Sequence, residues 1–166
     1  MGSFYCQSDI MVKEELACYY NSKTTEPLYV YGAYEGEVID SIFNSLKKWK
    51  WINVELTESK NGWFKIVFIK DILDDNNFVS GKNDFWINTD KLILDLRVYT
   101  EDYFVVVYED HNLKSKVIFK FVKFQTVNVV AFTENWVEIW TLVDGEVIKG
   151  WVSKSDVCAY PWTACP

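Results

Sequence analysis

The side chains best suited to covalent chemistry in this 166-residue chain are four cysteines and one histidine. His111 stands in a polar stretch between two expected strands, and no second histidine supports it. Cys158 follows an expected strand, and its nearer neighbour in the sequence is Cys165. A reactive thiol needs a base or a helix N-terminus that lowers its pKa, and neither is expected beside these residues. The sequence therefore predicts a protein that is not an enzyme.

The cysteines form two pairs that are close in sequence, Cys6 with Cys18 and Cys158 with Cys165. An even number of cysteines at short spacing is typical of disulfides and of an oxidising compartment, so we expect an exported protein. Pro161 favours a turn between Cys158 and Cys165, which makes these two the better disulfide candidates. Free buried thiols are the alternative. A zinc site is disfavoured because neither spacing supplies the close cysteine pair of a structural zinc site.

Composition excludes several other functions. The net charge is -7 with 17 basic residues, which is too little positive charge to neutralise a row of phosphates, so no nucleic acid partner is expected. No apolar run reaches the length of a transmembrane helix. Residues 71–77 lack the alternating ligands of a calcium loop, and no glycine-rich phosphate loop is present, so we expect no cofactor and no metal. The first residues lack the basic and apolar regions of a secretion signal, and we interpret the sequence as a mature form with an added start.

The remaining side chains favour a β fold. Aromatic residues make up 17% of the chain (8 Trp, 10 Tyr and 11 Phe), and together with Val, Ile and Thr they suit the half-buried surface of a pleated sheet. Apolar and polar residues alternate in several short segments, as expected for strands with one buried face. The sequence therefore predicts an all-β protein with no helical run between its strands.

Four landmarks occur twice along the chain, in the same order. Residues 25–31 resemble 100–106, 38–39 match 117–118, 61–66 match 134–139, and 86–92 match 151–157. The spacing between landmarks changes slightly, as loop insertions do to two copies of one module. The sequence therefore predicts two copies of one small β unit.

Each copy is expected to contain five short strands. In the first copy these are residues 28–31, 38–43, 51–56, 63–69 and 85–87, with a tight turn at Asn61-Gly62 and a polar loop within 74–83. In the second copy they are residues 104–108, 117–121, 126–132, 136–142 and 147–152, with a turn at Asp144-Gly145. Short antiparallel strands in this number predict small barrels. Residues 1–26 match neither copy, and we interpret 11–20 as a short helix or a packed arm.

The landmarks resemble a known family. The second copy contains Asn135-Trp136, a turn, and Gly150-Trp151-Val152, and the first contains Asn61-Gly62-Trp63 and then Phe85-Trp86, with Phe85 in place of the glycine. This pattern resembles the bacterial SH3 (SH3b) domain family, and tandem copies with a cysteine-flanked tail resemble exported SH3-containing proteins of Bacteroidetes. The resemblance implies two tandem small SH3-like β-barrels with a short N-terminal arm, the arm at 1–24 and the barrels at 25–97 and 98–166. The glycine before the second tryptophan is expected to let another backbone approach closely.

The aromatic residues divide into two predicted groups. The repeated tryptophans are expected to be core residues of very small barrels, and they are Trp63, Trp86, Trp136 and Trp151. The others exceed what two small barrels can bury, and exposed Trp and Tyr are typical of binding hot spots. These candidates for ligand or partner binding are Tyr31, Tyr34, Trp49, Trp51, Tyr108, Trp140 and Trp162. Contact between the two barrels is the competing use of these side chains.

The resemblance also suggests a function. SH3b domains commonly tether an enzyme to peptidoglycan stem peptides, but no catalytic domain is expected in this chain. We therefore expect a non-catalytic exported binding protein, periplasmic or extracellular, that engages a protein partner, for instance as an immunity or inhibitor protein against a secreted toxin. An acidic surface would speed encounter with a basic partner. Binding to peptidoglycan stem peptides is the alternative, and a scaffold whose barrels act as spacers is a third interpretation.

Overall fold

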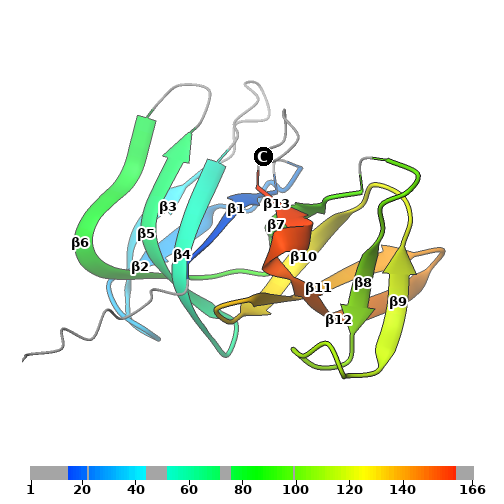
Figure 1. Ribbon diagram of the computed structural model, residues 1–166. Helices are drawn as coiled ribbons and strands as arrows, with labels where there is room; N and C mark the ends of the chain where they lie inside the picture. Colours follow the sequence, from blue (N-terminus) through cyan, green and yellow to red (C-terminus); the bar gives the residue numbers. More distant parts are fainter. Residues whose placement is uncertain (1–14, 22, 44–51, 72–75, 99, 160–166) are drawn as a thin grey trace, which may run out of the picture.

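Strands make up most of the chain, as the alternating sequence predicts. The computed structural model describes residues 15–21, 23–43, 52–71, 76–98 and 100–159. These ranges contain a 13-stranded sheet and a short 3-10 helix, with no α-helix (Figure 1). In the described ranges, no helix has the length and apolar character needed to span a membrane. The all-β prediction is confirmed.

The strands have the following bounds. The first six are β1 Leu16–Tyr20, β2 Leu28–Tyr31, β3 Val38–Ile42, β4 Ile52–Lys60, β5 Trp63–Asp71 and β6 Asn76–Asn88. The next six are β7 Leu92–Leu96, β8 Val105–Tyr108, β9 Val117–Phe121, β10 Thr126–Phe132, β11 Trp136–Val143 and β12 Glu146–Ser153. The chain then forms the 3-10 helix η1 Lys154–Asp156 and β13 Val157–Cys158.

The sheet consists of two halves that repeat the same strand order. The order is β3-β2-β6-β5-β4-β1-β7-β10-β11-β12-β8-β9, and β13 pairs with β7 off this path. Each strand of the first half, β1 to β6, therefore has a counterpart six numbers later in the second half, β7 to β12, and the two halves run outward in the same order from the β1–β7 pair. The two halves meet where β1 pairs with β7 in antiparallel orientation (Figure 1). The duplication in the sequence is thus a duplication of strand arrangement.

Strand β7 takes part in both halves. Tyr20 of β1 lies opposite Leu92 of β7, and Leu96 of β7 lies opposite Val157 of β13. Because Leu92 and Val157 are the last residues of matching landmarks, β7 pairs with β1 as β13 pairs with β7. β7 also pairs with β10 as β1 pairs with β4. It is therefore both the last strand of the first half and the first strand of the second.

Sequence reasoning missed β1 and β7. All five residues of β7 are buried, so this strand has no alternation that would reveal it. A short helix is wrong for Leu16–Tyr20, because pairing of β1 on both sides overrides local preference. The predicted polar loop is wrong from Asn76 onward, where β6 begins and pairs along β5. Residues 74 and 75 lie outside the described part of the chain.

The two predicted tight turns are confirmed. Asn61 and Gly62 have φ angles of 50° and 78°, and Asp144 and Gly145 have φ angles of 52° and 86°. Positive φ at both central residues is the type I′ geometry, whose twist matches that of the flanking strands. These turns set the register of the β4–β5 and β11–β12 hairpins.

One apolar core extends through both halves. Alternate residues of β4, β5, β10 and β11 point into it, as the period of two requires. Residues of β1 and β7 lie at its middle, where the halves meet. Its fully buried members include Leu28, Val54, Leu56, Leu92, Leu94, Leu96, Val127, Val137 and Ile139.

Cys18 belongs to this core. Its side chain is fully buried in β1, and its thiol donates to the carbonyl oxygen of Val54 at 3.7 Å. The thiol is free, so the expectation of a disulfide at Cys18 is wrong, because the inward-facing position in β1 places it among β4 and β7. Cys158 in β13 is buried and disulfide-bonded. Cys6 and Cys165 lie outside the described residues, and the pairing of Cys158 with Cys165 stays a prediction.

Candidate functional site

Four aromatic side chains of the first half lie in contact on the outer face of the sheet. Cluster 1 consists of Tyr31 in β2, Tyr34 in the following loop, Trp63 at the start of β5 and Trp86 in β6. The ring centroids of Tyr31 and Trp63 are 4.7 Å apart, and the Tyr34 ring lies 5.6 Å from Trp63 and 5.3 Å from Trp86. The Lys60 ammonium lies 4.3 Å from the centroid of Tyr34. Tilted and edge-on rings at these distances attract one another, and so does a cation over a ring.

Strand alternation places cluster 1 on the outer face. Phe64 and Ile87 are buried in the core, so the adjacent Trp63 and Trp86 point to the opposite side of the sheet. Antiparallel pairing then sets Tyr31 opposite Trp86. The cluster therefore follows from pleat and register, and it does not depend on a loop conformation except at its edge.

The second half carries a matching group. Cluster 2 consists of Tyr108 in β8, His111 in the following loop, Trp136 at the start of β11 and Trp151 in β12. The Tyr108 and Trp136 centroids are 5.6 Å apart with an interplanar angle of 87°, and His111 lies 5.0 Å from Trp151. Tyr108 is opposite Trp151, which is the register of the corresponding pair in cluster 1. The two clusters therefore occupy equivalent places in the two halves.

Three of the four tryptophans predicted as core residues lie outside the core. Trp86 is buried, with 7% of its surface exposed, but Trp63, Trp136 and Trp151 are half-buried on the outer face. The prediction is wrong for these three because an alternating pattern with aromatic residues in both sets does not say which set faces inward. Clusters 1 and 2 therefore contain both tryptophans that were predicted as core residues and tyrosines that were predicted as contact residues.

Sequence reasoning missed His111 as a cluster member. It follows the tyrosine of β8 at the spacing by which Tyr34 follows Tyr31, and that spacing is the signal that would have found it. His111 Nδ1 lies 2.6 Å from Asp110 Oδ1, and its ring packs beside Trp151. An imidazole therefore stands in cluster 2 where cluster 1 has the phenol of Tyr34.

The two clusters differ in the ion pairs beside them. Lys65 Nζ lies 2.7 Å from Asp84 Oδ1 in the first half, and Lys149 Nζ lies 3.3 Å from Glu138 Oε1 in the second. Lys65 and Glu138 both stand two residues after the first tryptophan of their cluster, so the pair is reversed between the halves. The clusters therefore share their aromatic composition but not their charge pattern.

Gly150 confirms the predicted close approach of two backbones. A Cβ atom at this position would lie 2.5 Å from the carbonyl oxygen of Tyr108 and 2.8 Å from Val107 Cγ1. Phe85 occupies the matching position in the first half, where it is partly buried against the core and β2 still pairs with β6. The departure from glycine in the first copy therefore leaves the strand pairing intact.

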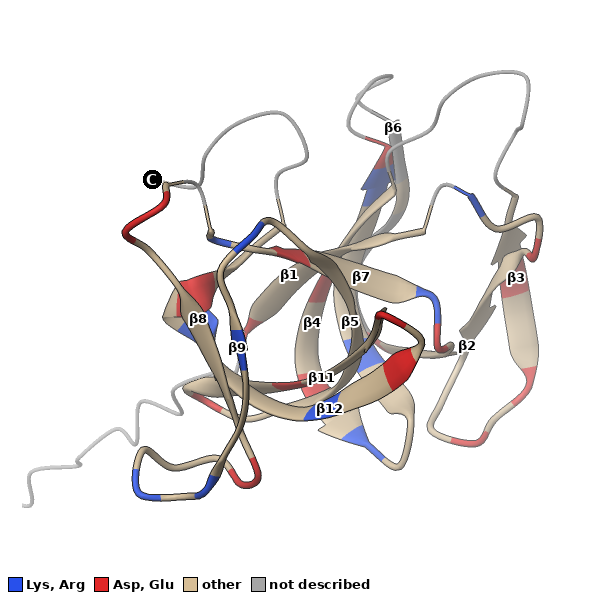
Figure 2. Ribbon diagram, turned by 90° about the vertical axis from the view of Figure 1, so that its right-hand side faces the viewer, with Lys and Arg blue, Asp and Glu red and all other residues tan. Residues whose placement is uncertain are grey.

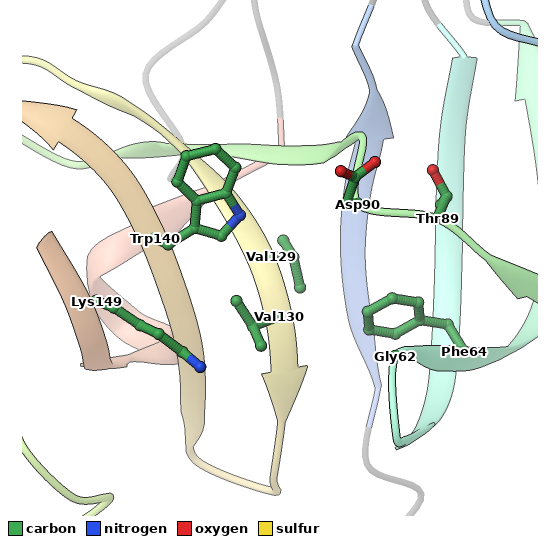
Figure 3. A pocket seen from close by; sticks show the side chains of 8 residues that line it. All are labelled: Gly62, Phe64, Thr89, Asp90, Val129, Val130, Trp140 and Lys149. Atoms are coloured by element: carbon green, nitrogen blue, oxygen red, sulfur yellow. The ribbon is translucent and has the colours of Figure 1, made fainter. Parts of the chain in front are cut away.

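The remaining predicted contact residues do not join the clusters. Trp140 lies on the outer face of β11 and lines a cleft of about 270 Å³ between the two halves (Figure 3). Trp49, Trp51 and Trp162 lie outside the described residues. Among the predicted candidates, the structure therefore brings together Tyr31, Tyr34 and Tyr108 with the repeated tryptophans, and sets Trp140 apart.

Buried polar groups join the two halves near β7. Asp95 is buried and accepts a hydrogen bond from Thr126 Oγ1 at 2.7 Å. Burial, and then the Asp95 carboxylate, raise the pKa of Tyr19 far above its usual range, so the phenol stays protonated and donates to Asp95. Burial likewise raises the pKa of the Cys18 thiol, which disfavours the reactive thiolate. In the described part of the chain no three His, Cys, Asp or Glu side chains are grouped so as to hold a metal ion.

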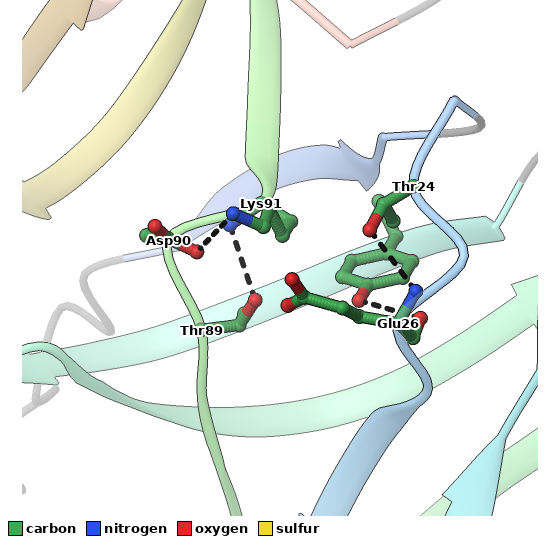
Figure 4. A network of polar contacts seen from close by, with 6 residues as sticks. Thr24, Glu26, Thr89, Asp90 and Lys91 are labelled. Carbon is green, nitrogen blue, oxygen red and sulfur yellow. Dashed lines mark hydrogen bonds and ion pairs between the residues drawn. The ribbon is translucent and has the colours of Figure 1, made fainter.

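A polar network orders the turn that leads into β7 (Figure 4). Lys91 Nζ lies 3.0 Å from Asp90 Oδ1, and the backbone N–H of Lys91 donates to Thr89 Oγ1 at 3.1 Å. On the neighbouring connection, the Tyr20 hydroxyl donates to the carbonyl oxygen of Glu26 at 3.0 Å. Thr89 and Asp90 also line the cleft, so this network positions one of its walls.

Comparison with known proteins adds little to this geometry. The chain matches no protein-family model and no curated protein. Two similar solved structures are NlpC1 and NlpC2 from Trichomonas vaginalis, each 13% identical, with TM-scores of 0.34 and 0.35. The matches cover 98% and 90% of this chain but 51% and 49% of those chains, so this chain spans about half their length. At these TM-scores the likeness supports no conclusion about fold or activity.

Proposed function

We propose that this chain is a non-catalytic binding protein built from two SH3-like β-barrels, and that clusters 1 and 2 form its contact surface for a protein partner. The repeated strand order and register of the two halves support this architecture. In this arrangement β7 belongs to both barrels, so their boundary lies within Leu92–Leu96 and not after residue 97. The SH3b resemblance of the landmarks supports the same division.

The observation that carries the proposal is the duplication of aromatic side chains, most of them half-buried, at equivalent positions on the outer face. The core is complete without them, because the inward-facing set of each strand is already apolar and buried. Trp and Tyr supply large, rigid contact area and are enriched among residues whose truncation weakens protein binding most. Each cluster therefore offers what a binding hot spot requires, a packed aromatic group open on one side.

The charge around cluster 1 favours a basic partner. The hairpin of β2 and β3 holds the exposed residues Glu35 and Glu37 in its loop and Asp40 in β3, and it has no Lys or Arg (Figure 2). The whole chain carries a net charge of -7. Complementary charge mainly raises the association rate and excludes like-charged partners. An exported immunity or inhibitor protein that blocks a basic secreted toxin has these properties.

The test uses the immobilised protein and the secreted proteins of the organism it comes from. We expect one captured protein whose affinity falls by roughly 30-fold or more in Trp63→Ala or Trp136→Ala, the loss typical of a hot spot. Leu142→Ala is the matched control, because Leu142 is an exposed apolar residue outside both clusters. Capture that survives both tryptophan variants contradicts the proposal. Sedimentation with purified peptidoglycan sacculi that depends on the same tryptophans would replace the protein partner by a stem peptide.

A further inference from the structure

The cleft between the two halves is lined by residues that differ from those of clusters 1 and 2. One wall comes from the first half, with Phe64 of β5 and Asp90 before β7, and the other comes from the second half, with Val129 and Val130 of β10, Trp140 of β11 and Lys149 of β12 (Figure 3). Its volume is about 270 Å³. None of these residues belongs to clusters 1 and 2, so the cleft is separate from the proposed partner surface.

The cleft is held open by two fixed connections between the halves. At one connection β1 and β7 pair through Tyr19 and Ile93. At the other, Ser59 Oγ donates to the carbonyl oxygen of Phe132 at 3.0 Å and accepts from the Phe132 N–H at 2.9 Å. Two separate connections restrain the halves against closing or sliding. The cleft is therefore preformed, which lowers the entropic cost of binding.

The bottom of the cleft is apolar and its rim is charged. Phe64 and Val129 are 1% and 2% exposed, and the half-buried ring of Trp140 lies on the wall above Val129 (Figure 3). The rim carries Asp90 on the first half and Lys149 on the second, and the side chain of Lys149 extends towards the opposite wall (Figure 3). The cleft therefore offers a negative group on one wall, a positive group on the other, and an apolar surface between them.

Both rim charges keep hydrogen-bonding capacity for a ligand. Asp90 uses Oδ1 for Lys91, and its side chain is 69% exposed. Lys149 contacts Glu138 at 3.3 Å, and its side chain is 56% exposed. A carboxylate has several acceptor sites and an ammonium has three donors, so neither ion pair saturates its members.

The repeat explains only part of this cleft. Glu55 and Asn128 stand at equivalent positions, and they lie opposite Phe68 and Trp140, so both halves carry an aromatic ring at this place. Counted from the second tryptophan of each half, Lys149 corresponds to Asp84. The positive charge at the rim therefore stands only in the second half.

We propose that this cleft binds a small zwitterion with an apolar side chain, of the size of an aromatic or branched amino acid. The ligand ammonium pairs with Asp90, the ligand carboxylate pairs with Lys149, and the side chain lies against Phe64, Val129 and Trp140. Ligand sites of proteins commonly combine an apolar lining with a few convergent polar groups, as this cleft does. The volume is near the lower end for such sites and suits a ligand of this size.

The test uses L-phenylalanine as the probe on the full chain, with calorimetry and tryptophan fluorescence as measurements. L-phenylalaninamide lacks the carboxylate, and N-acetyl-L-phenylalanine lacks the ammonium. We expect saturable binding of L-phenylalanine at one site, and about tenfold weaker binding of each derivative, since a charge-assisted hydrogen bond is lost in each. This comparison needs no variant, so it does not depend on the folding of altered chains.

Two variants then assign the charges. Lys149→Met should abolish the preference for L-phenylalanine over its amide, and Asp90→Asn should abolish the preference over the N-acetyl form. Lys120→Met on the distant strand β9, and Trp63→Ala in cluster 1, should leave binding unchanged. The proposal is overturned if L-phenylalanine shows no saturable binding, if the three probes bind equally, or if Lys149→Met and Asp90→Asn leave the preferences intact. Loss of partner capture in Trp63→Ala alone bears only on the clusters.

Discussion

The substitution Gly150→Ala tests how closely the paired strands β8 and β12 approach each other. The added methyl group would lie 2.5 Å from the Tyr108 carbonyl oxygen, 2.8 Å from Val107 Cγ1 and 2.9 Å from Ile118 Cδ1. Even a close carbon–oxygen contact needs roughly 3.3 Å, so the two strands must separate by roughly 0.8 Å. The Tyr108 oxygen is a backbone atom in a paired strand and cannot rotate away. The whole hairpin of β8 and β9 has to move.

The expected cost follows from this overpacking. Extra methyl groups in well-packed sites cost about 1–3 kcal/mol, and three short contacts, one of them to backbone, place this site at about 3 kcal/mol. For a chain of this length that loss lowers the melting temperature by roughly 6–12 °C. The movement also displaces Tyr108 from Trp136, so the tryptophan fluorescence of cluster 2 should change in the folded state.

The assay is urea unfolding of the variant beside Gly145→Ala. Gly145 has φ of 86° and no atom within 4 Å of an added Cβ, so its loss is purely conformational, about 1–2 kcal/mol. In the Gly150→Ala background, Ile118→Ala should not restore stability, because the backbone oxygen is the main obstacle. The close approach is refuted if Gly150→Ala costs less than Gly145→Ala, or if Ile118→Ala rescues it fully.

Other predictions concern the joints between the halves. Ser59→Ala loses both hydrogen bonds to the second half and should lower the unfolding free energy by about 1–2 kcal/mol, measured in urea, and weaken L-phenylalanine binding. Thr126→Val removes one of the two side-chain donors to buried Asp95, the other being Tyr19, and should cost about 1–3 kcal/mol, whereas Thr126→Ser should retain most of the stability. Burial raises the pKa of the Cys18 thiol in the folded protein. The contribution of this thiol to the unfolding free energy is therefore complete at pH 7, and it is lost as the pH rises above about 8.5, where the thiol of the unfolded chain ionises. The unfolding free energy should then fall by up to about 1.4 kcal/mol per pH unit, and Cys18→Val should remove this onset. A fragment of residues 98–166 lacks β7 and should show no cooperative unfolding by circular dichroism, and cooperative melting of this fragment would contradict the common strand.

Two strands were predictable to the residue for different reasons. In residues 126–132 polar and apolar side chains alternate over the first four positions. Residues 117–121 consist of Val, Ile, Phe and one Lys, and β-branched and aromatic residues of this kind favour a strand. The turns Asn61-Gly62 and Asp144-Gly145 were predictable because few residues accept positive φ. β7 was not predictable in this way, since it is covered on both faces and its buried residues, four apolar ones and Asp95, show no alternation.

The sequence was sufficient to predict that aromatic residues form the candidate site, but not which of them lie together. The repeat identifies Trp63 and Trp136 as equivalent, and the excess of aromatic residues indicates a contact surface. Which face of a strand turns inward depends on what the rest of the chain buries, and this placed the tryptophans beside Tyr31 and Tyr108 on the outer face. The cleft beside Trp140 depends on how the two halves join, which no local pattern records.

The all-β class, the tight turns and the duplication can be read from the chain alone, because they depend on side-chain period and on the φ preferences of single residues. The remaining features depend on contacts between distant segments. Only long-range pairing places β1 between β4 and β7, makes β7 a member of both halves, and brings Phe64 and Asp90 to face Trp140 and Lys149. The physical reason is that hydrogen bonds between distant strands, and the burial they create, are set by the whole chain at once.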